Sequence, residues 1–165
     1  MSGAWWSTKS RQFIRHLFAR VTPTERAQLA TWLAPAQLAL FDSMHRADQR
    51  HGLDVVRTLR AAGHAERDVL LAGLLHDCAK GHRVGVWHRV GWSLADRYGA
   101  RVRGLAVRLP GFADAFVNLD MHAERSAELA LLAGCSRRTA ELIQHQAQPI
   151  DAAFGEALRL ADEAS

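Results

Sequence analysis

Four histidines and two aspartates stand at positions where the surrounding pattern predicts apolar residues. Apolar side chains recur every three or four residues around them, which places them on the inward faces of predicted helices. Burying an unpaired carboxylate or an unsatisfied polar group is costly. A lone inward histidine is more simply a hydrogen-bonded core residue, but imidazoles and carboxylates gathered from five helices favour a shared Fe, Mn, Zn, Co or Ni ion. The six residues are His51, His76, Asp77, His122, His145 and Asp162.

The adjacent pair His76 and Asp77 lies in the stretch LLAGLLHDCAKGH, directly after the apolar run 70–75. Neighbouring side chains on a helix differ by about 100° in direction, so both reach one region most easily at a helix end. Lys80 would then lie in the turn just beyond the pair. It either neutralises charge on a phosphoryl group of a substrate or caps the end of the helix.

Two further polar residues accompany these candidates. Asp48 lies on the same helical face as His51, one turn earlier, and either accepts a hydrogen bond that orients the His51 ring or forms a core salt bridge with an arginine. Cys78 follows the His-Asp pair, and we expect it to pack rather than to bind metal. With Cys135 it is one of only two cysteines, which indicates a reduced, cytoplasmic protein.

Basic residues downstream of the pair are candidates for contact with substrate phosphates. They are His82, Arg83 and His88, alongside Lys80, although for each of the three taken singly we favour a solvated surface position. The chain carries a net charge of +4, and 19 of its 21 basic residues are arginine because lysine occurs only twice. Arginine suits phosphate and carboxylate groups, so the charge fits an anionic substrate. The arginines form no dense cluster, which makes nucleic acid an unfavoured partner.

The length of 165 residues and the apolar fraction of 48% fit one domain with a sizeable core. No apolar stretch reaches the ~18 residues that a membrane span needs, and the first residues lack the pattern of a secretion signal. We therefore expect no membrane partner. Helical spacing dominates and strand signals are weak, so we predict an all-α fold of about seven helices. One expected helix begins at Thr22, and the others cover about 8–20, 35–62, 66–78, 86–107, 113–133, 137–147 and 152–163, with breaks near the start of 35–62 and at Gly91 or Gly99.

The order of these residues resembles the HD-domain superfamily of metal-dependent phosphohydrolases. The pattern of that superfamily is a histidine, a His-Asp pair and a distant aspartate, which map here to His51, His76-Asp77 and Asp162. The stretches DQRHGLDVV, LLHDCAK and LRLADE carry the resemblance, which covers about residues 41–163. It implies one HD-type domain over 1–165, in which a helical extension, 1–40, packs on a metal-binding core, 41–163.

Two more stretches, MHAERSAELALLAG and ELIQH, are similar to those of superfamily members with two extra histidines and a second metal. The nearest subgroup that we can name is the bacterial diadenosine-tetraphosphate hydrolases, whereas the HD-GYP phosphodiesterases are less similar. The resemblance implies that Asp77 bridges two ions. His51, His76 and Asp162 would complete one ion, and His122 and His145 would hold the other.

The function implied is hydrolysis of a phosphoester or phosphoanhydride of a nucleotide or a similar small phosphorylated substrate, through a hydroxide activated by one or two divalent transition ions, with iron as the first choice. Asp77 and Lys80 would be the catalytic residues. The alternatives are a catalytically silent HD module that binds metal and nucleotide as a sensor, and an arginine-rich helical domain that binds nucleic acid. A homodimer is compatible with the sequence.

Overall fold

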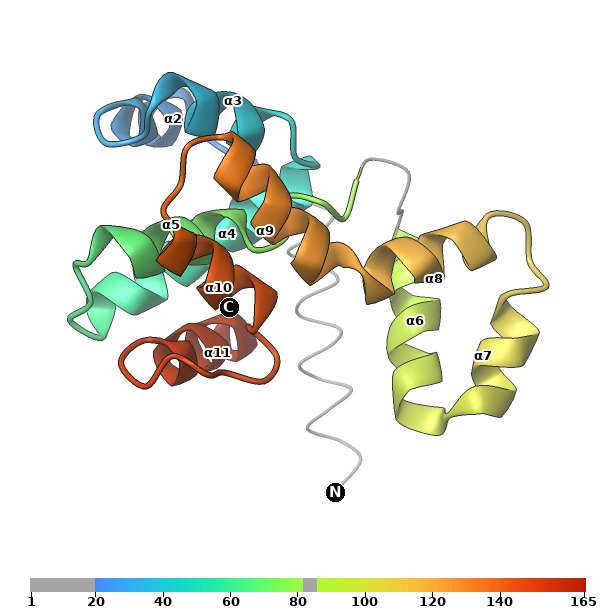
Figure 1. Cartoon of the computed structure of the whole chain (residues 1–165). Coiled ribbons are helices and arrows are strands. Elements are labelled where there is room, and N and C mark those ends of the chain that lie inside the picture. Colours follow the sequence, from blue (N-terminus) through green and yellow to red (C-terminus); the bar gives the residue numbers. More distant parts are fainter. Residues whose placement is uncertain (1–19, 82–85) are drawn as a thin grey trace.

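The computed structural model describes residues 20–81 and 86–165, and within these ranges the chain is helical without strands (Figure 1). The predicted all-α class is therefore confirmed. The described residues form ten helices, because several of the expected helices are divided. In chain order they are α2 (Pro23–Ala30), α3 (Pro35–Asp42), α4 (Arg46–Ala61), α5 (Arg67–Leu75), α6 (Val86–Tyr98), α7 (Ala100–Ala106), α8 (Phe112–Asp120), α9 (His122–Leu132), α10 (Arg137–Gln144) and α11 (Gly155–Ala164).

Several helix ends follow from local sequence. Thr22 and Glu25 form a capping box at the start of α2, and the Ser136 hydroxyl accepts from the Thr139 amide at the start of α10. Each such cap satisfies an amide that the helix itself leaves unpaired. Gly99 separates α6 from α7 in a backbone conformation with a φ of 84°, which glycine adopts without strain. The helix expected at 8–20 lies almost wholly outside the described residues.

The prediction of one helix over 113–133 is wrong. The chain breaks at Met121, between α8 and α9, although neither glycine nor proline is present there. The carbonyl of Leu119 is bound by the ring of His122, and the Asp120 carboxylate is held by Arg103 and Trp92. A ring contact across the break and the contacts of Asp120 with residues of α6 and α7, rather than a helix-breaking residue, therefore accompany this break.

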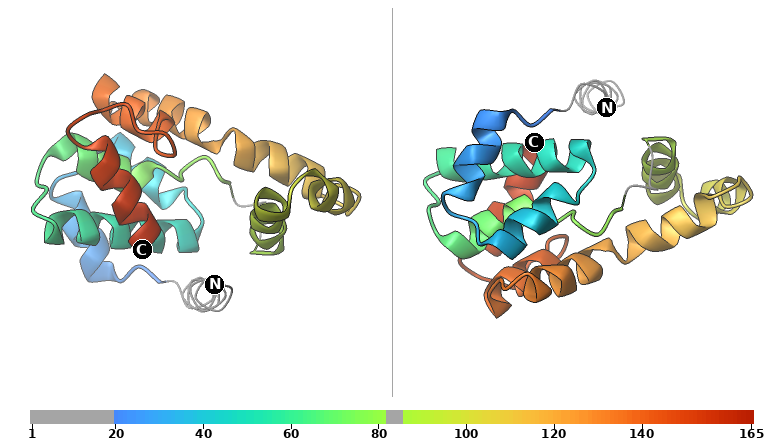
Figure 2. Two further views of the ribbon diagram at one scale, coloured as in Figure 1. Left: turned by 90° about the horizontal axis from the view of Figure 1, so that it is seen from below. Right: turned by 90° about the horizontal axis from the view of Figure 1, so that it is seen from above.

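The main core lies around α5, which contacts α3, α4, α10 and α11, while α9 packs on α10 and adds Ala127 and Ala130 to the core (Figure 2). Every residue of α5 from Val69 to Leu75 is buried, as its continuous apolar run predicts. The surrounding helices contribute one apolar stripe each, including Val55 and Leu59 from α4 and Leu158 from α11. A central helix that is apolar all round brings whatever follows it into the interior.

Residues 86–121 form an arm that projects from this body, with α7 and the α7–α8 turn at its far end (Figures 1 and 2). The arm has a small core of its own made of Trp92, Ala115 and Leu119. Asp120, at the end of α8, joins the three helices of the arm. Its carboxylate accepts from the Trp92 indole of α6 at 2.9 Å and from the Arg103 guanidinium of α7. In the sequence, the arm thus lies between the turn that holds Lys80 and the start of α9 at His122.

The α4 and α5 backbones approach closely at Gly52. A Cβ atom placed on this residue would lie 2.4 Å from the carbonyl oxygen of Leu74, which is shorter than any real contact. Gly52 follows His51, and Leu74 lies two residues before His76. The glycine therefore sets the distance between the two histidines.

None of the described helices is long and apolar enough to cross a membrane.

We expect Gly52→Ala to lower the free energy of unfolding by about 1–3 kcal/mol, because the added methyl group pushes α4 away from α5. Gly104→Ala is the matched control. It lies in exposed α7 with no atom near the new methyl group, so the better helix propensity of alanine should leave stability unchanged or raised by up to about 1 kcal/mol. Urea unfolding of both variants gives the comparison, and equal stability of Gly52→Ala and wild type would contradict the close approach.

Candidate metal centre

The His-Asp pair lies at the end of the buried helix, as its sequence predicts. α5 ends at Leu75, and His76 is its C-terminal cap residue. The following residues form a turn that Ser126 of α9 fixes, since its hydroxyl accepts from the Ala79 amide at 3.0 Å. The side chains of His76 and Asp77 are each only 2% exposed.

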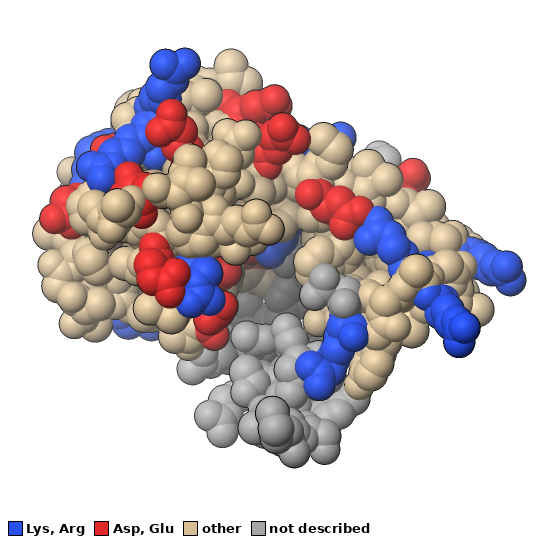
Figure 3. Space-filling model, turned by 60° about the horizontal axis from the view of Figure 1, so that its bottom comes forward, with Lys and Arg blue, Asp and Glu red and all other residues tan. Residues whose placement is uncertain are grey.

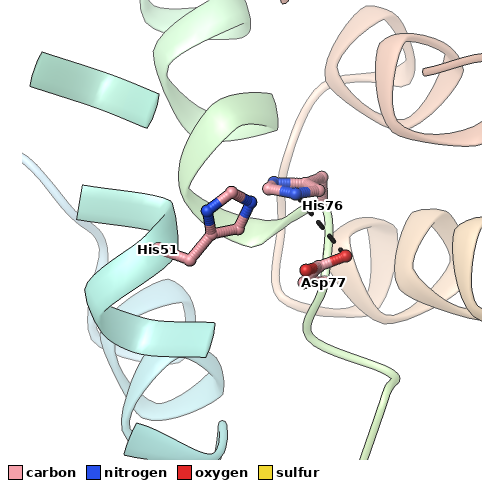
Figure 4. A group of neighbouring side chains, drawn as sticks. All are labelled: His51, His76 and Asp77. Atoms are coloured by element: carbon pink, nitrogen blue, oxygen red, sulfur yellow. Dashed lines mark ion pairs between the residues drawn. The ribbon is translucent and has the colours of Figure 1, made fainter. Parts of the chain in front are cut away.

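Three other helices direct a ligating side chain at this pair. His51 comes from α4, Asp162 from α11 and His122 from the first turn of α9. The Oδ1 atom of Asp162 lies 2.7 Å from His51 Nε2 and 3.3 Å from His76 Nε2. Figure 4 shows the His51 ring and the His76 ring meeting beside Asp77, with one ligand atom from each of the three within 4.8 Å of the others.

Backbone carbonyls fix the orientation of two of the rings. His76 Nδ1 lies 3.0 Å from the Gly73 carbonyl oxygen, and His122 Nδ1 lies 2.5 Å from that of Leu119. A carbonyl only accepts, so each Nδ1 carries the proton, and a neutral ring then presents the lone pair of its Nε2. Both Nε2 atoms face the same atom, Oδ1 of Asp77, at 3.5 and 3.6 Å.

The Oδ1 atom of Asp77 is buried and accepts no hydrogen bond from the described residues. Its companion Oδ2 accepts from the Lys80 ammonium group at 2.5 Å. Acceptor atoms without a donor among them require a proton or a metal ion in their midst. Ligands about 2.0–2.2 Å from one ion lie about 3.0–3.4 Å apart, close to the spacing seen here. The residues therefore fit a divalent transition ion.

Charge at the site shifts the ionisation of its members. Burial opposes a proton on His76, but the Asp77 and Asp162 carboxylates outweigh it and raise its pKa to about 9. Burial likewise opposes the charge on the two carboxylates. The imidazoles around them, joined at Asp77 by Lys80, nevertheless keep the pKa of each well below its usual range. Both carboxylates are thus anionic at neutral pH, as metal binding requires.

Burial decides the protonation of two other residues at the site, His122 and Cys78. Burial and the charge of Lys80 lower the pKa of His122, so its ring is neutral and its lone pair available. Burial raises the pKa of the Cys78 thiol to about 12, which keeps it protonated. Its sulfur contacts the Ser126 carbonyl. We conclude that Cys78 packs, as expected, and offers no thiolate ligand.

The cluster is buried on one side and open on the other. Asp162 and His51 are 38% and 28% exposed at their side chains, and Lys80 is 20% exposed. Structural metal sites are closed, whereas catalytic sites keep a position open to water or substrate. On the face in Figure 3, basic side chains extend along the arm, and residues 97–113 contain four arginines with no aspartate or glutamate.

Ion pairs and hydrogen bonds join five of the six predicted ligands, and the place of His145 in the set stays a prediction. His145 is half-buried at the C-terminal cap of α10, and no hydrogen bond or ion pair of its side chain reaches the cluster within the described part of the chain.

Asp48 is buried one turn before His51 on α4, and its role in orienting that ring stays a prediction. His88 packs against the Phe112 ring, with the ring centroids 4.7 Å apart. His82 and Arg83 lie outside the described residues.

Sequence reasoning missed two residues that shape the site. Gln146 places its side-chain nitrogen 3.3 Å from His122 Nε2, and no pattern marked this loop position. Gly52, which sets the approach of α4 to α5, stood in the sequence beside His51 but carries no signal of a helix contact.

Comparisons of the chain with models of protein families, with curated proteins and with solved structures found no match. The assignment of chemistry to this centre therefore depends on the geometry and on the resemblance in sequence.

The stability of the metal-free protein should depend on pH through His76. The pKa of His76 is raised when the chain folds. Its protonation therefore adds fully to the free energy of unfolding below 6.5, the pKa in the unfolded chain, and this gain is lost as pH rises toward 9. The pKa values of Asp77 and Asp162 are lowered, so these carboxyl groups titrate far below this pH range. We therefore expect the EDTA-treated protein to lose up to about 3 kcal/mol between pH 6.5 and 9.

Chemical unfolding at several pH values measures this loss. The variant His76→Asn should show little of it. Adding Mn²⁺ should restore stability at the alkaline end, because the ion takes the place of the proton. An equal pH dependence in wild type and His76→Asn would show that another group is responsible.

Proposed function

We propose that this protein is a metal-dependent phosphohydrolase of the HD type that cleaves a phosphoester or phosphoanhydride bond in a nucleotide or a similar small phosphorylated substrate. The observation that carries the proposal is the partnerless Oδ1 atom of buried Asp77, on which the Nε2 atoms of His76 and His122 converge. The open side of the cluster and the adjacent lysine favour catalysis over a structural role.

The first metal position would be formed by His51, His76, Asp77 and Asp162. A divalent transition ion bound there, with iron as first choice, would supply Lewis acidity and a water molecule of lowered pKa. The two carboxylates bring negative charge to match the ion. The backbone carbonyl that holds His76 Nδ1 orients its ring and fixes the tautomer.

Lys80 would stabilise negative charge on the phosphoryl group as it develops. Its ammonium group is bound to Asp77 Oδ2 rather than to carbonyl groups at the end of α5, which favours the role at the site over the role of a helix cap. It is partly exposed, so it can contact a bound substrate while it balances the charge of Asp77. The arginines of the arm suit the remaining phosphate groups of an anionic substrate.

A second ion, as in the dinuclear HD enzymes that the sequence resembles, would be held by His122 and bridged by Asp77. His122 supports this position, because its lone pair already faces the Asp77 carboxylate. His145, at the C-terminal cap of α10, would complete this second position. A cytoplasmic location is also part of the proposal, supported by the two free cysteines, both buried.

We expect phosphate or nucleotide release from at least one phosphoester, dependent on added Fe²⁺, Mn²⁺, Co²⁺ or Ni²⁺. Asp77→Asn should lose both metal and turnover. Lys80→Ala should retain the metal and lose about 100- to 1,000-fold in rate, which is the usual cost of deleting a group that stabilises transition-state charge. Metal content and phosphate release are measured on the same samples.

Asp42→Asn provides the control, since this exposed carboxylate pairs with Arg26 away from the centre; it should leave both quantities unchanged. A metal-loaded protein that turns over no substrate in a broad nucleotide screen would shift the conclusion to a catalytically silent module that binds metal and nucleotide.

A further inference from the structure

The ring of His122 is held so that one nitrogen is available to a partner. The carbonyl oxygen of Leu119 accepts from Nδ1 at 2.5 Å, which fixes the proton there. The Nε2 atom therefore carries the lone pair.

Two side chains face that lone pair. Asp77 presents Oδ1 at 3.6 Å, which can only accept. Gln146 presents its side-chain nitrogen at 3.3 Å. The amide must be oriented with its NH₂ group toward the ring, because its oxygen would repel the lone pair. Gln146 thus donates the hydrogen bond that His122 Nε2 accepts.

Gln146 is well placed to be released. It lies in the loop that follows the cap of α10 and leads toward α11, and its side chain is half-buried. Within the described residues, the contact with His122 is the only hydrogen bond of this side chain. Swinging outward therefore breaks one bond and leaves the backbone of the loop in place.

We propose that Gln146 competes with a metal ion for the lone pair of His122, so that the second metal position fills later and more weakly than the first. The inference rests on the proposed metal centre and names a residue that controls how this centre is loaded. The ion and the Gln146 amide cannot occupy Nε2 together, since a single lone pair serves both.

The charges around the two metal positions also favour the first ion over the second. The first position has two carboxylates, Asp77 and Asp162, within reach of its imidazoles. The His122 position shares only Asp77, whose other oxygen is already neutralised by Lys80. A second cation would thus meet less negative charge and must also displace Gln146.

Replacing Gln146 tests the competition. Gln146→Leu removes the donor, and the loss of one neutral hydrogen bond should tighten binding of the second ion about two- to tenfold. Gln146→Glu removes the donor and adds a carboxylate, so it should tighten binding further. Gln144→Leu, at an exposed position two residues earlier, is the matched control. Neither substitution should change the affinity of the first ion.

Equilibrium dialysis of the full chain against Mn²⁺ alone, followed by elemental analysis, gives both affinities. In the metal-free protein, the ¹⁵N resonance of His122 Nε2 should move in Gln146→Leu and stay in place in Gln144→Leu. This second readout needs no metal and reports the contact itself.

Tighter second-ion binding in both Gln146 variants, with the first ion unaffected, is the expected result. One tightly bound ion in wild type, with an equal or weaker second ion in Gln146→Leu, would overturn the inference and leave the proposed metal centre standing. Binding of no Mn²⁺ by wild type or any variant would overturn both.

Discussion

The structure depends on one buried carboxylate oxygen, Oδ1 of Asp77, which has no hydrogen-bond donor among the described residues. An isolated buried charge of this kind costs several kcal/mol unless something compensates it. Compensation comes from two directions: Lys80 balances the other oxygen of the same carboxylate, and imidazoles from separate helices approach Oδ1 itself. A cation at their meeting point satisfies the carboxylate and the imidazole lone pairs together, which a set of separate hydrogen bonds does not.

Much of this centre could be read from the sequence because the signals are local. The apolar run of α5 places whatever follows it in the interior, and a helix end is where adjacent side chains can share one region. His51 and Asp162 follow from apolar stripes on α4 and α11, since helical spacing decides which face a residue occupies. The all-α class follows from the same periodicity.

Other features depend on contacts between distant parts of the chain, which periodicity does not encode. A stripe gives the face of a residue but not its distance from another helix, so the stripes placed His122 and His145 inward without showing that the two meet. The break at Met121 lacks a glycine or proline, and Gln146 belongs to a loop without a pattern. The spacing of His51 from His76 is set by a glycine meeting a carbonyl oxygen on another helix, which only the packed structure reveals.

The arm between Lys80 and His122 takes part in the centre although it projects away from it (Figure 1). Its last helix supplies the Leu119 carbonyl that fixes the tautomer of His122, and Leu119 itself is buried in the small core of the arm. A continuous helix over 113–133 would pair that carbonyl with a backbone amide instead. The break at Met121 therefore lets the arm, rather than the body, determine which nitrogen of His122 faces Asp77. Packing within the arm thus sets the chemistry of a ligand that belongs to the body.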